Sequence, residues 1–340
     1  MGIDLSLIWI LIIAFGLMMY VVMDGSDLGI GILFPFVPLR SERDLMVNTV
    51  APVWDGNETW LVLGGAGLLA AFPLAYSVLL SALYIPIVLM LMGLILRGVA
   101  FEFRFKADET HRPFWDVAFA GGSYTAAFFQ GAALGAFIDG FAVTGPSYDG
   151  GALDWLTPFS VFTGIGVIVA YALLASTWLT MKTEGALQGR MIFYARRIVP
   201  VLLVGIGIVS LWTPLAHAAI ARRWFSVPDI FYFAPVPILV LATSWQLMRL
   251  LTGGSTGKVP HAGPFLLALF LLFLGYSGLA ISLWPNIIPP AVSFRAAAAP
   301  PQSQGFALVG ALLIIPIILA YTGWAYYVFR GKVREGEGYH

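Results

Sequence analysis

Long apolar runs dominate this chain and decide what it can fold into. A helix needs about 20 mostly apolar residues to cross a bilayer. Nine segments satisfy this requirement, at approximately residues 5–34, 45–72, 75–103, 115–138, 157–181, 198–217, 229–251, 263–284 and 305–329. Charged residues make up only 11% of the 340 residues, whereas soluble domains carry about 25%. The sequence therefore predicts an all-α integral membrane protein with about nine transmembrane helices.

The basic residues predict how these helices are oriented. If the N-terminus lies outside, every Lys and Arg falls toward the cytosolic side except Arg222, Arg223 and Arg295. Cytosolic loops of membrane proteins carry an excess of Lys and Arg. We therefore expect a periplasmic N-terminus and a cytoplasmic C-terminus. The first run has no basic segment before it and no small-residue cleavage site after it, so we expect a retained helix rather than a signal peptide.

Two pairs of acidic residues interrupt the first two apolar runs. Asp24 and Asp27 lie in "VVMDGSDLGIGILF", and Asp55 and Glu58 lie in "APVWDGNETW". The members of each pair are three residues apart, so they share one helix face. The turn "PLRSER" between the runs is equally distant from Asp27 and Asp55, and also from Asp24 and Glu58. An antiparallel helical hairpin would therefore place the two pairs at matched depth in the membrane.

Acids within a membrane span are rare and usually functional. Four of them at one depth do not all stay ionised, so they are expected to share protons. This property is typical of a proton pathway, in which we place Asp24, Asp27, Asp55 and Glu58. Arg97, late in the third run, is the expected buried cation beside them. A purely structural role stays open, with Asp24 and Asp27 bonding backbone N–H groups and Asp55 pairing with Arg97.

Other residue types limit the chemistry of the chain. It contains no Cys, and its four His residues (His111, His217, His261 and His340) lie outside the middle of every predicted span. Buried haem irons take His, Met or Cys ligands. The ten Met residues leave a Met-ligated haem open, but Met more often fills gaps in packing, so we expect no metal site and no catalytic residue in this chain. The net charge of zero gives no reason to expect a nucleic-acid partner.

Two tryptophans, Trp54 and Trp60, flank the second acidic pair. They are candidate contacts for a quinone ring or a haem edge. Packing within the helix bundle is the alternative role for both of them.

Four stretches, "MDGSDLGIGILFPF", "NTVAPVWDGNETWLV", "RGVAFEFRFK" and "PPAVSFRAAAAP", resemble subunit II of the cytochrome bd ubiquinol oxidases. The short length and the Ala-rich loop resemble the cyanide-insensitive branch of this family. One departure is Phe294 followed by Arg295, where an acidic residue is expected in the outer loop. The resemblance covers the whole chain.

The resemblance implies a bacterial inner-membrane complex that oxidises ubiquinol and reduces oxygen to water. Its partner, subunit I, would hold two haems b and haem d, and a small single-span subunit is a further possible partner. Acids matching Asp27 and Asp55 would lie on a proton path, and a structural quinone and membrane lipid are possible ligands.

The family fold would be a single membrane domain of two four-helix bundles and a peripheral helix. These parts would correspond to residues of about 1–140, 157–284 and 305–329. Two other functions share the intramembrane acids. A proton-coupled secondary transporter would need a substrate cavity with broken helices at the midplane, and an assembly scaffold would leave the acids replaceable.

Overall fold

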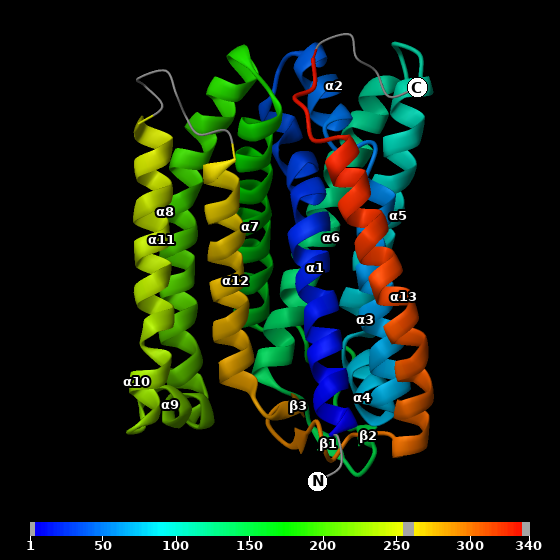
Figure 1. Ribbon diagram of the computed structural model, residues 1–340, viewed down its shortest axis with the longest axis vertical. Helices are drawn as coiled ribbons and strands as arrows, with labels where there is room; N and C mark the ends of the chain where they lie inside the picture. Colours follow the sequence, from blue (N-terminus) through cyan, green and yellow to red (C-terminus); the bar gives the residue numbers. More distant parts are fainter. Residues whose placement is uncertain (1–3, 254–261, 335–340) are drawn as a thin grey trace.

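The computed structural model of the chain describes residues 4–253 and 262–334. Long helices run side by side in an elongated bundle, and α1 begins at one end of it while α13 finishes at the other (Figure 1). We call these the α1-start end and the α2 end, because the short helix α2 lies at the latter. His261, His340 and Lys258 fall outside the described residues.

Within the described ranges, nine helices are 18 residues or longer. They are α1 (Leu5–Leu33), α3 (Trp54–Ala71), α5 (Tyr84–Lys106), α6 (Arg112–Asp139), α7 (Pro158–Lys182), α8 (Gly185–Ala216), α11 (Pro235–Gly253), α12 (Gly263–Leu283) and α13 (Pro301–Val328). Seven of the helices are long and apolar enough to cross a membrane. The other two long helices are α3, which carries the polar group Asp55, Asn57 and Glu58, and α6, which is rich in Gly and Ala. The predicted all-α membrane architecture is confirmed.

Short elements connect the long helices at the two ends of the bundle. The helical ones are the 3₁₀ turn η1 (Phe34–Phe36), α2 (Arg40–Asn48), α4 (Pro73–Ala82), α9 (Ala218–Phe225) and α10 (Asp229–Phe233). Two antiparallel hairpins pair β1 (Val143–Thr144) with β2 (Ser147–Tyr148), and β3 (Asn286–Ile288) with β4 (Val292–Ser293). Helix α9, which carries Arg222 and Arg223, lies at the α1-start end (Figure 1).

Several predicted segments differ from the structure in their bounds. Helix α8 begins at Gly185, well before the predicted segment 198–217. Two other segments are divided, and proline explains both divisions. The segment 45–72 is divided, because α2 ends at Asn48 and α3 begins only at Trp54. Pro52 lies between them, where it removes a backbone donor and disfavours helix before it. The segment 75–103 is also divided, since α4 ends at Ala82. Pro86 lies four residues later, and its ring would clash with the Ala82 carbonyl in a continuous helix.

Helices α1, α3, α5 and α6 pack together, as do α7, α8, α11 and α12, while α13 contacts α1 and α3. Helix α7 also packs on α1 and α6, so it joins the two groups. Close approach to α1 depends on glycine, because a Cβ on Gly29 would overlap the Tyr171 carbonyl oxygen of α7. A Cβ on Gly31 would overlap the Ser123 hydroxyl of α6. The segment with Asp24 and Asp27 is therefore enclosed by neighbouring helices.

Candidate functional site

Arg97 is the centre of a buried ionic cluster. It lies on the buried face of α5, with only 1% of its side chain exposed. Its Nη2 pairs with Asp24 of α1, which is fully buried, and lies 3.1 Å from Glu58 Oε1 of α3. One cation therefore binds an acid from each of the two predicted pairs. The structure places Arg97, the expected buried cation, between these two acids.

Asp27 is buried beside this cluster but has a different partner. Its Oδ2 accepts a hydrogen bond of 2.8 Å from Asn57 Nδ2 of α3. The Asn57 side chain is also bonded to Tyr326 of α13, whose hydroxyl lies 3.2 Å from Nδ2 and 3.3 Å from Oδ1. Three helices therefore meet at Asn57, and sequence reasoning missed both Asn57 and Tyr326.

Asp55 lies one helical turn before Glu58 but takes no part in the buried ion pairs. It is in the first turn of α3 and its side chain is exposed in this chain. Within the described residues Asp55 forms no ion pair, and Arg97 pairs with Asp24 and Glu58 instead of with Asp55 as the structural alternative required. The matched-depth argument assumed a continuous hairpin, but α3 starts only at Trp54. As a result Asn57, rather than Asp55, meets Asp27.

Several polar atoms of the cluster are buried without a hydrogen-bond partner among the described residues. They are Asp24 Oδ2, Asp27 Oδ1, Arg97 Nε and Arg97 Nη1. Most buried polar groups in proteins bond to protein or to ordered water. Acids and a cation with unused bonding capacity can bind water between them. The cluster therefore has the chemistry needed to hold and pass a proton.

A second polar chain extends from α1 toward α7. Gln130 Nε2 of α6 donates a hydrogen bond of 2.6 Å to the Tyr20 hydroxyl of α1. The Tyr171 hydroxyl of α7 donates one of 2.7 Å to Gln130 Oε1. Tyr20 precedes Asp24 by one helical turn, so this chain reaches the ionic cluster from the side of the second helix group. No sequence motif pointed to these three residues.

The two tryptophans differ in how they can act. Trp54 stacks on Phe101 with 5.1 Å between ring centroids, and the Arg97 guanidinium lies 5.5 Å from its ring. Trp60 is fully buried and packs edge-on against Phe15, with 5.6 Å between the ring centroids. Trp60 therefore has no free face for a quinone, whereas such a contact at Trp54 stays a prediction.

A second buried arginine, Arg104, organises the α2 end of the bundle. It is fully buried, with Nη1 2.6 Å from Asp44 Oδ1 of α2 and Nε 2.6 Å from Asp116 Oδ1 of α6. Arg112 pairs with the same Asp44 at 2.5 Å, and Arg43 with the same Asp116 at 3.0 Å. Sequence reasoning did not single out Arg104 as a buried cation. Arg104 lies seven residues after Arg97, which is two helical turns along the same face of α5. This spacing was the signal that could have identified Arg104.

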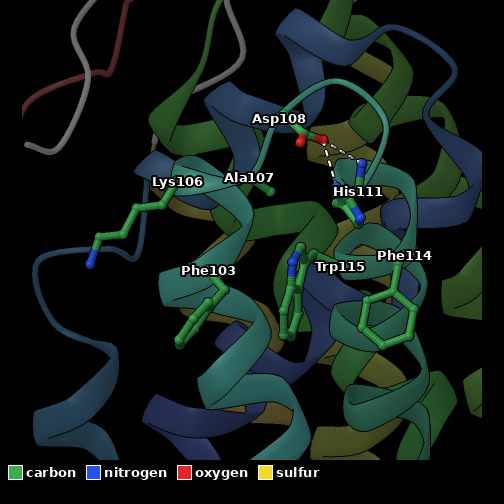
Figure 2. A pocket seen from close by; sticks show the side chains of 7 residues that line it. All are labelled: Phe103, Lys106, Ala107, Asp108, His111, Phe114 and Trp115. Atoms are coloured by element: carbon green, nitrogen blue, oxygen red, sulfur yellow. Dashed lines mark hydrogen bonds and ion pairs between the residues drawn. The ribbon is translucent and has the colours of Figure 1, made fainter.

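The α5–α6 turn carries a surface pocket of about 500 Å³ that does not include the acids of the cluster. Figure 2 shows the aromatic rings of Phe103, Phe114 and Trp115 beside Asp108 and His111. Asp108 Oδ1 lies 2.8 Å from His111 Nδ1. The backbone N–H and the ring of His111 both lower the pKa of Asp108. None of the residues that line this pocket belongs to the ionic cluster, so the pocket is separate from the candidate site.

The described part of the chain offers little to bind a metal. It contains no group of three or more His, Cys, Asp or Glu residues arranged to bind a metal ion. His111 pairs with Asp108 in an exposed turn, and His217 Nε2 lies 3.4 Å from Asp139 Oδ1. These two histidines lie at helix ends and are not arranged as a pair of haem ligands.

Comparisons with known proteins agree with this architecture. Residues 5–329 match the family model of cytochrome bd terminal oxidase subunit II. Cytochrome bd-I ubiquinol oxidase subunit 2 of Escherichia coli K12 is 28% identical, over 98% of this chain and 96% of that protein. Cytochrome bd ubiquinol oxidase subunit 2 of Bacillus subtilis is 27% identical, over 97% of each chain.

The structure of bd oxidase from Geobacillus thermodenitrificans has the same fold. It superimposes with a TM-score of 0.76 over 97% of this chain and 99% of that chain, at 11% identity. The family match covers nearly the whole chain, and the solved structure matches over almost its full length. The chain therefore belongs to the family of cytochrome bd terminal oxidase subunit II, multi-pass proteins of the bacterial inner membrane that act together with a subunit I.

Proposed function

We propose that this chain carries protons from the cytosol toward the oxygen-reducing centre of its partner subunit. The path would run through the acids Asp24, Asp27 and Glu58 around Arg97, with Asp55 at its exposed edge. The buried cluster carries this proposal. Asp24 and Glu58 pair with Arg97, Asp27 is buried beside them, and Asp24 and Asp27 each keep a carboxylate oxygen without a partner among the described residues. Intramembrane acids in such an arrangement are typical of proton relays.

The reaction would be the oxidation of ubiquinol and the reduction of oxygen to water. The names of the Escherichia coli and Bacillus subtilis relatives, both ubiquinol oxidase subunits, support this substrate. Haems b and d in subunit I would supply the electron transfer. The residues of this chain would hold protons, release them and exclude bulk water. The family assignment gives no support to a secondary transporter.

The charge distribution supports a cytosolic position for the α2 end. Arg40, Arg43 and Arg112 lie at this end, together with Arg104. Lys and Arg are enriched on the cytosolic side of membrane proteins. The N-terminus would then be periplasmic and the C-terminus cytoplasmic. Within the membrane, lipid would cover the exposed apolar side chains of α8, α11 and α13.

Three finer features of the family belong to the same proposal. A quinone would contact Trp54, which keeps a partly exposed ring next to Arg97. A small accessory subunit would bind at the surface of the complex. Cyanide resistance is a property of the haem site in the partner subunit. The resemblance of this chain to the cyanide-insensitive branch therefore stays a prediction from the sequence.

Co-purification tests the assignment. A tag on this chain should bring down a haem-containing partner, and the complex should show haem b and haem d absorption and consume oxygen with ubiquinol. A colourless chain that is stable and active alone would contradict the proposal. A complex that reduces oxygen but shows no proton uptake through this chain would contradict only its role as the proton path.

A further inference from the structure

The C-terminal end of α13 is held by a single buried lysine. Helix α13 is largely exposed, and among its residues only Gln304, Ala311 and Thr322 are buried. Just beyond the helix, Lys182 Nζ of α7 donates hydrogen bonds to the carbonyl oxygens of Phe329, at 2.5 Å, and Gly331, at 3.2 Å. Helix carbonyls at a C-terminus have no partner within the helix, so the ammonium group caps α13.

A backbone hydrogen bond and an aromatic contact of Lys182 strengthen this attachment. The Val333 backbone N–H donates to the Lys182 carbonyl oxygen at 3.0 Å. Lys332 Nζ lies 3.1 Å from Glu184 Oε1, but Glu184 is 69% exposed, so this surface ion pair adds little to the attachment. Lys182 itself is only 5% exposed, and its ammonium group lies 5.0 Å from the centroid of the Trp178 ring. The segment after α13 is therefore fixed to the end of α7 by contacts that centre on Lys182.

Tyr326 lies one helical turn before this cap and points into the candidate site. Its ring packs edge-on against Trp178, with 6.0 Å between centroids, so Trp178 contacts both Tyr326 and Lys182. Its hydroxyl is bonded to the Asn57 amide, and the same amide nitrogen donates to Asp27. A side-chain amide has two N–H donors, and here one faces Asp27 and the other faces Tyr326.

We propose that Tyr326 is a positioning residue for proton transfer through Asp27, and that Lys182 holds it in place. The hydroxyl fixes the orientation of the Asn57 amide, so that an N–H group faces the Asp27 carboxylate. Without the hydroxyl, the amide can rotate and present its oxygen to Asp27. This inference rests on the proposed function, because it requires that Asp27 carries protons.

The test uses the whole complex purified with its partner subunit. Tyr326→Phe removes the hydroxyl and keeps the ring, and Tyr327→Phe is the matched control, because the neighbouring Tyr327 side chain is 57% exposed. Loss of one hydrogen bond in the path should lower kcat for oxygen consumption about fivefold. The KM for quinol and the haem spectrum should stay unchanged, and the solvent deuterium isotope effect on kcat should rise. Tyr327→Phe should behave as the native complex.

Lys182 is tested in the same way, with Lys182→Met against Lys332→Met. Lys182→Met should lower kcat to a similar extent, whereas Lys332→Met should not. The double variant Lys182→Met/Tyr326→Phe should be no slower than the slower single variant, because both changes act on one arrangement. If the losses of kcat in the two single variants multiply in the double variant, the two residues do not act on one arrangement.

Three results separate this inference from the function on which it rests. If Tyr326→Phe has the kcat and isotope effect of Tyr327→Phe while Asp27→Asn is impaired, the inference about Tyr326 is wrong and the proton path stands. If Asp27→Asn is fully active, the proposed path itself fails. If activity in Tyr326→Phe falls only in proportion to lost haem, α13 serves assembly, which also overturns the inference.

Discussion

Arg97 and Asp24 form an ion pair in which neither side chain is more than 1% exposed. The pair joins α5 to α1, and Glu58 extends it to α3 at 3.1 Å. Removing one partner from a buried ion pair leaves an uncompensated charge, which costs far more than the pair itself contributes. The cluster therefore stabilises the packing of these three helices in addition to its proposed role in carrying protons. Mutations can separate the two roles.

Arg97→Met should destabilise the complex by about 3–5 kcal/mol, because Asp24 is left buried without its cation. The thermal unfolding of the purified complex and its haem content measure this loss. The double variant Arg97→Met/Asp24→Asn removes both charges and should recover part of the lost stability. If the double variant is as unstable as the sum of the two single variants, the two residues are not energetically coupled as described.

Asp55→Asn should behave differently, because Asp55 is exposed and has no ion pair within the described residues. Stability and haem content should stay near those of the native complex. Oxygen consumption should fall in kcat, with the KM for quinol little changed, since an exchangeable acid is lost without a binding contact. Asp55→Glu should recover part of the rate. Thr59→Val, one turn along the same exposed face, is the control, and an equal effect there would exclude a specific role for the Asp55 carboxyl group.

Arg104→Met should weaken the α2 end of the bundle by about 3–5 kcal/mol, because it leaves Asp44 and Asp116 without the cation that bridges them. Arg104→Lys should recover only part, since an ammonium group cannot reproduce the planar fork of a guanidinium. Lys106→Met is the control on the same helix. Lys106 is 76% exposed and its Nζ is 3.8 Å from Glu102, so its loss should cost about 0.5 kcal/mol or less. Similar melting temperatures for the two Met variants would contradict this account of Arg104.

Gly29→Ala should destabilise the complex by about 1–3 kcal/mol, because the added Cβ overlaps the Tyr171 backbone and pushes α1 away from α7. Gly166→Ala on α7 is the control. Nothing lies within 4 Å of a Cβ added there, and alanine favours helix by up to about 1 kcal/mol relative to glycine. Thermal unfolding compares the two variants, and an equal loss would show that the packing argument fails at Gly29.

The sequence predicted the long helices and their order well, because apolar length and loop charges are local properties. It also predicted that Arg97 would lie with the acids, since an arginine within an apolar run needs a counter-ion. It failed at Asp55, because the depth of a residue in a hairpin depends on where the second helix begins. It missed Asn57, Tyr326 and Gln130 because single uncharged polar residues carry no charge that would require a buried partner. Their roles depend on contacts between helices far apart in the chain.

The central claim is that Asp27 carries protons, and Asp27→Asn tests it most directly. The variant keeps the size of the side chain and an oxygen that can accept the hydrogen bond from Asn57, but it removes the exchangeable acid. Ser26→Ala is the matched control, because Ser26 is also buried and its hydroxyl bonds, among the described residues, only to the Val22 carbonyl oxygen of its own helix.

Oxygen consumption, proton uptake from the cytosolic side and haem absorption are measured together in proteoliposomes that contain the whole complex. The account predicts that Asp27→Asn keeps its haem and its KM for quinol but loses roughly tenfold or more in kcat and in proton uptake. Ser26→Ala keeps both rates. Native rates of oxygen consumption and proton uptake in Asp27→Asn, with haem intact, would contradict the account.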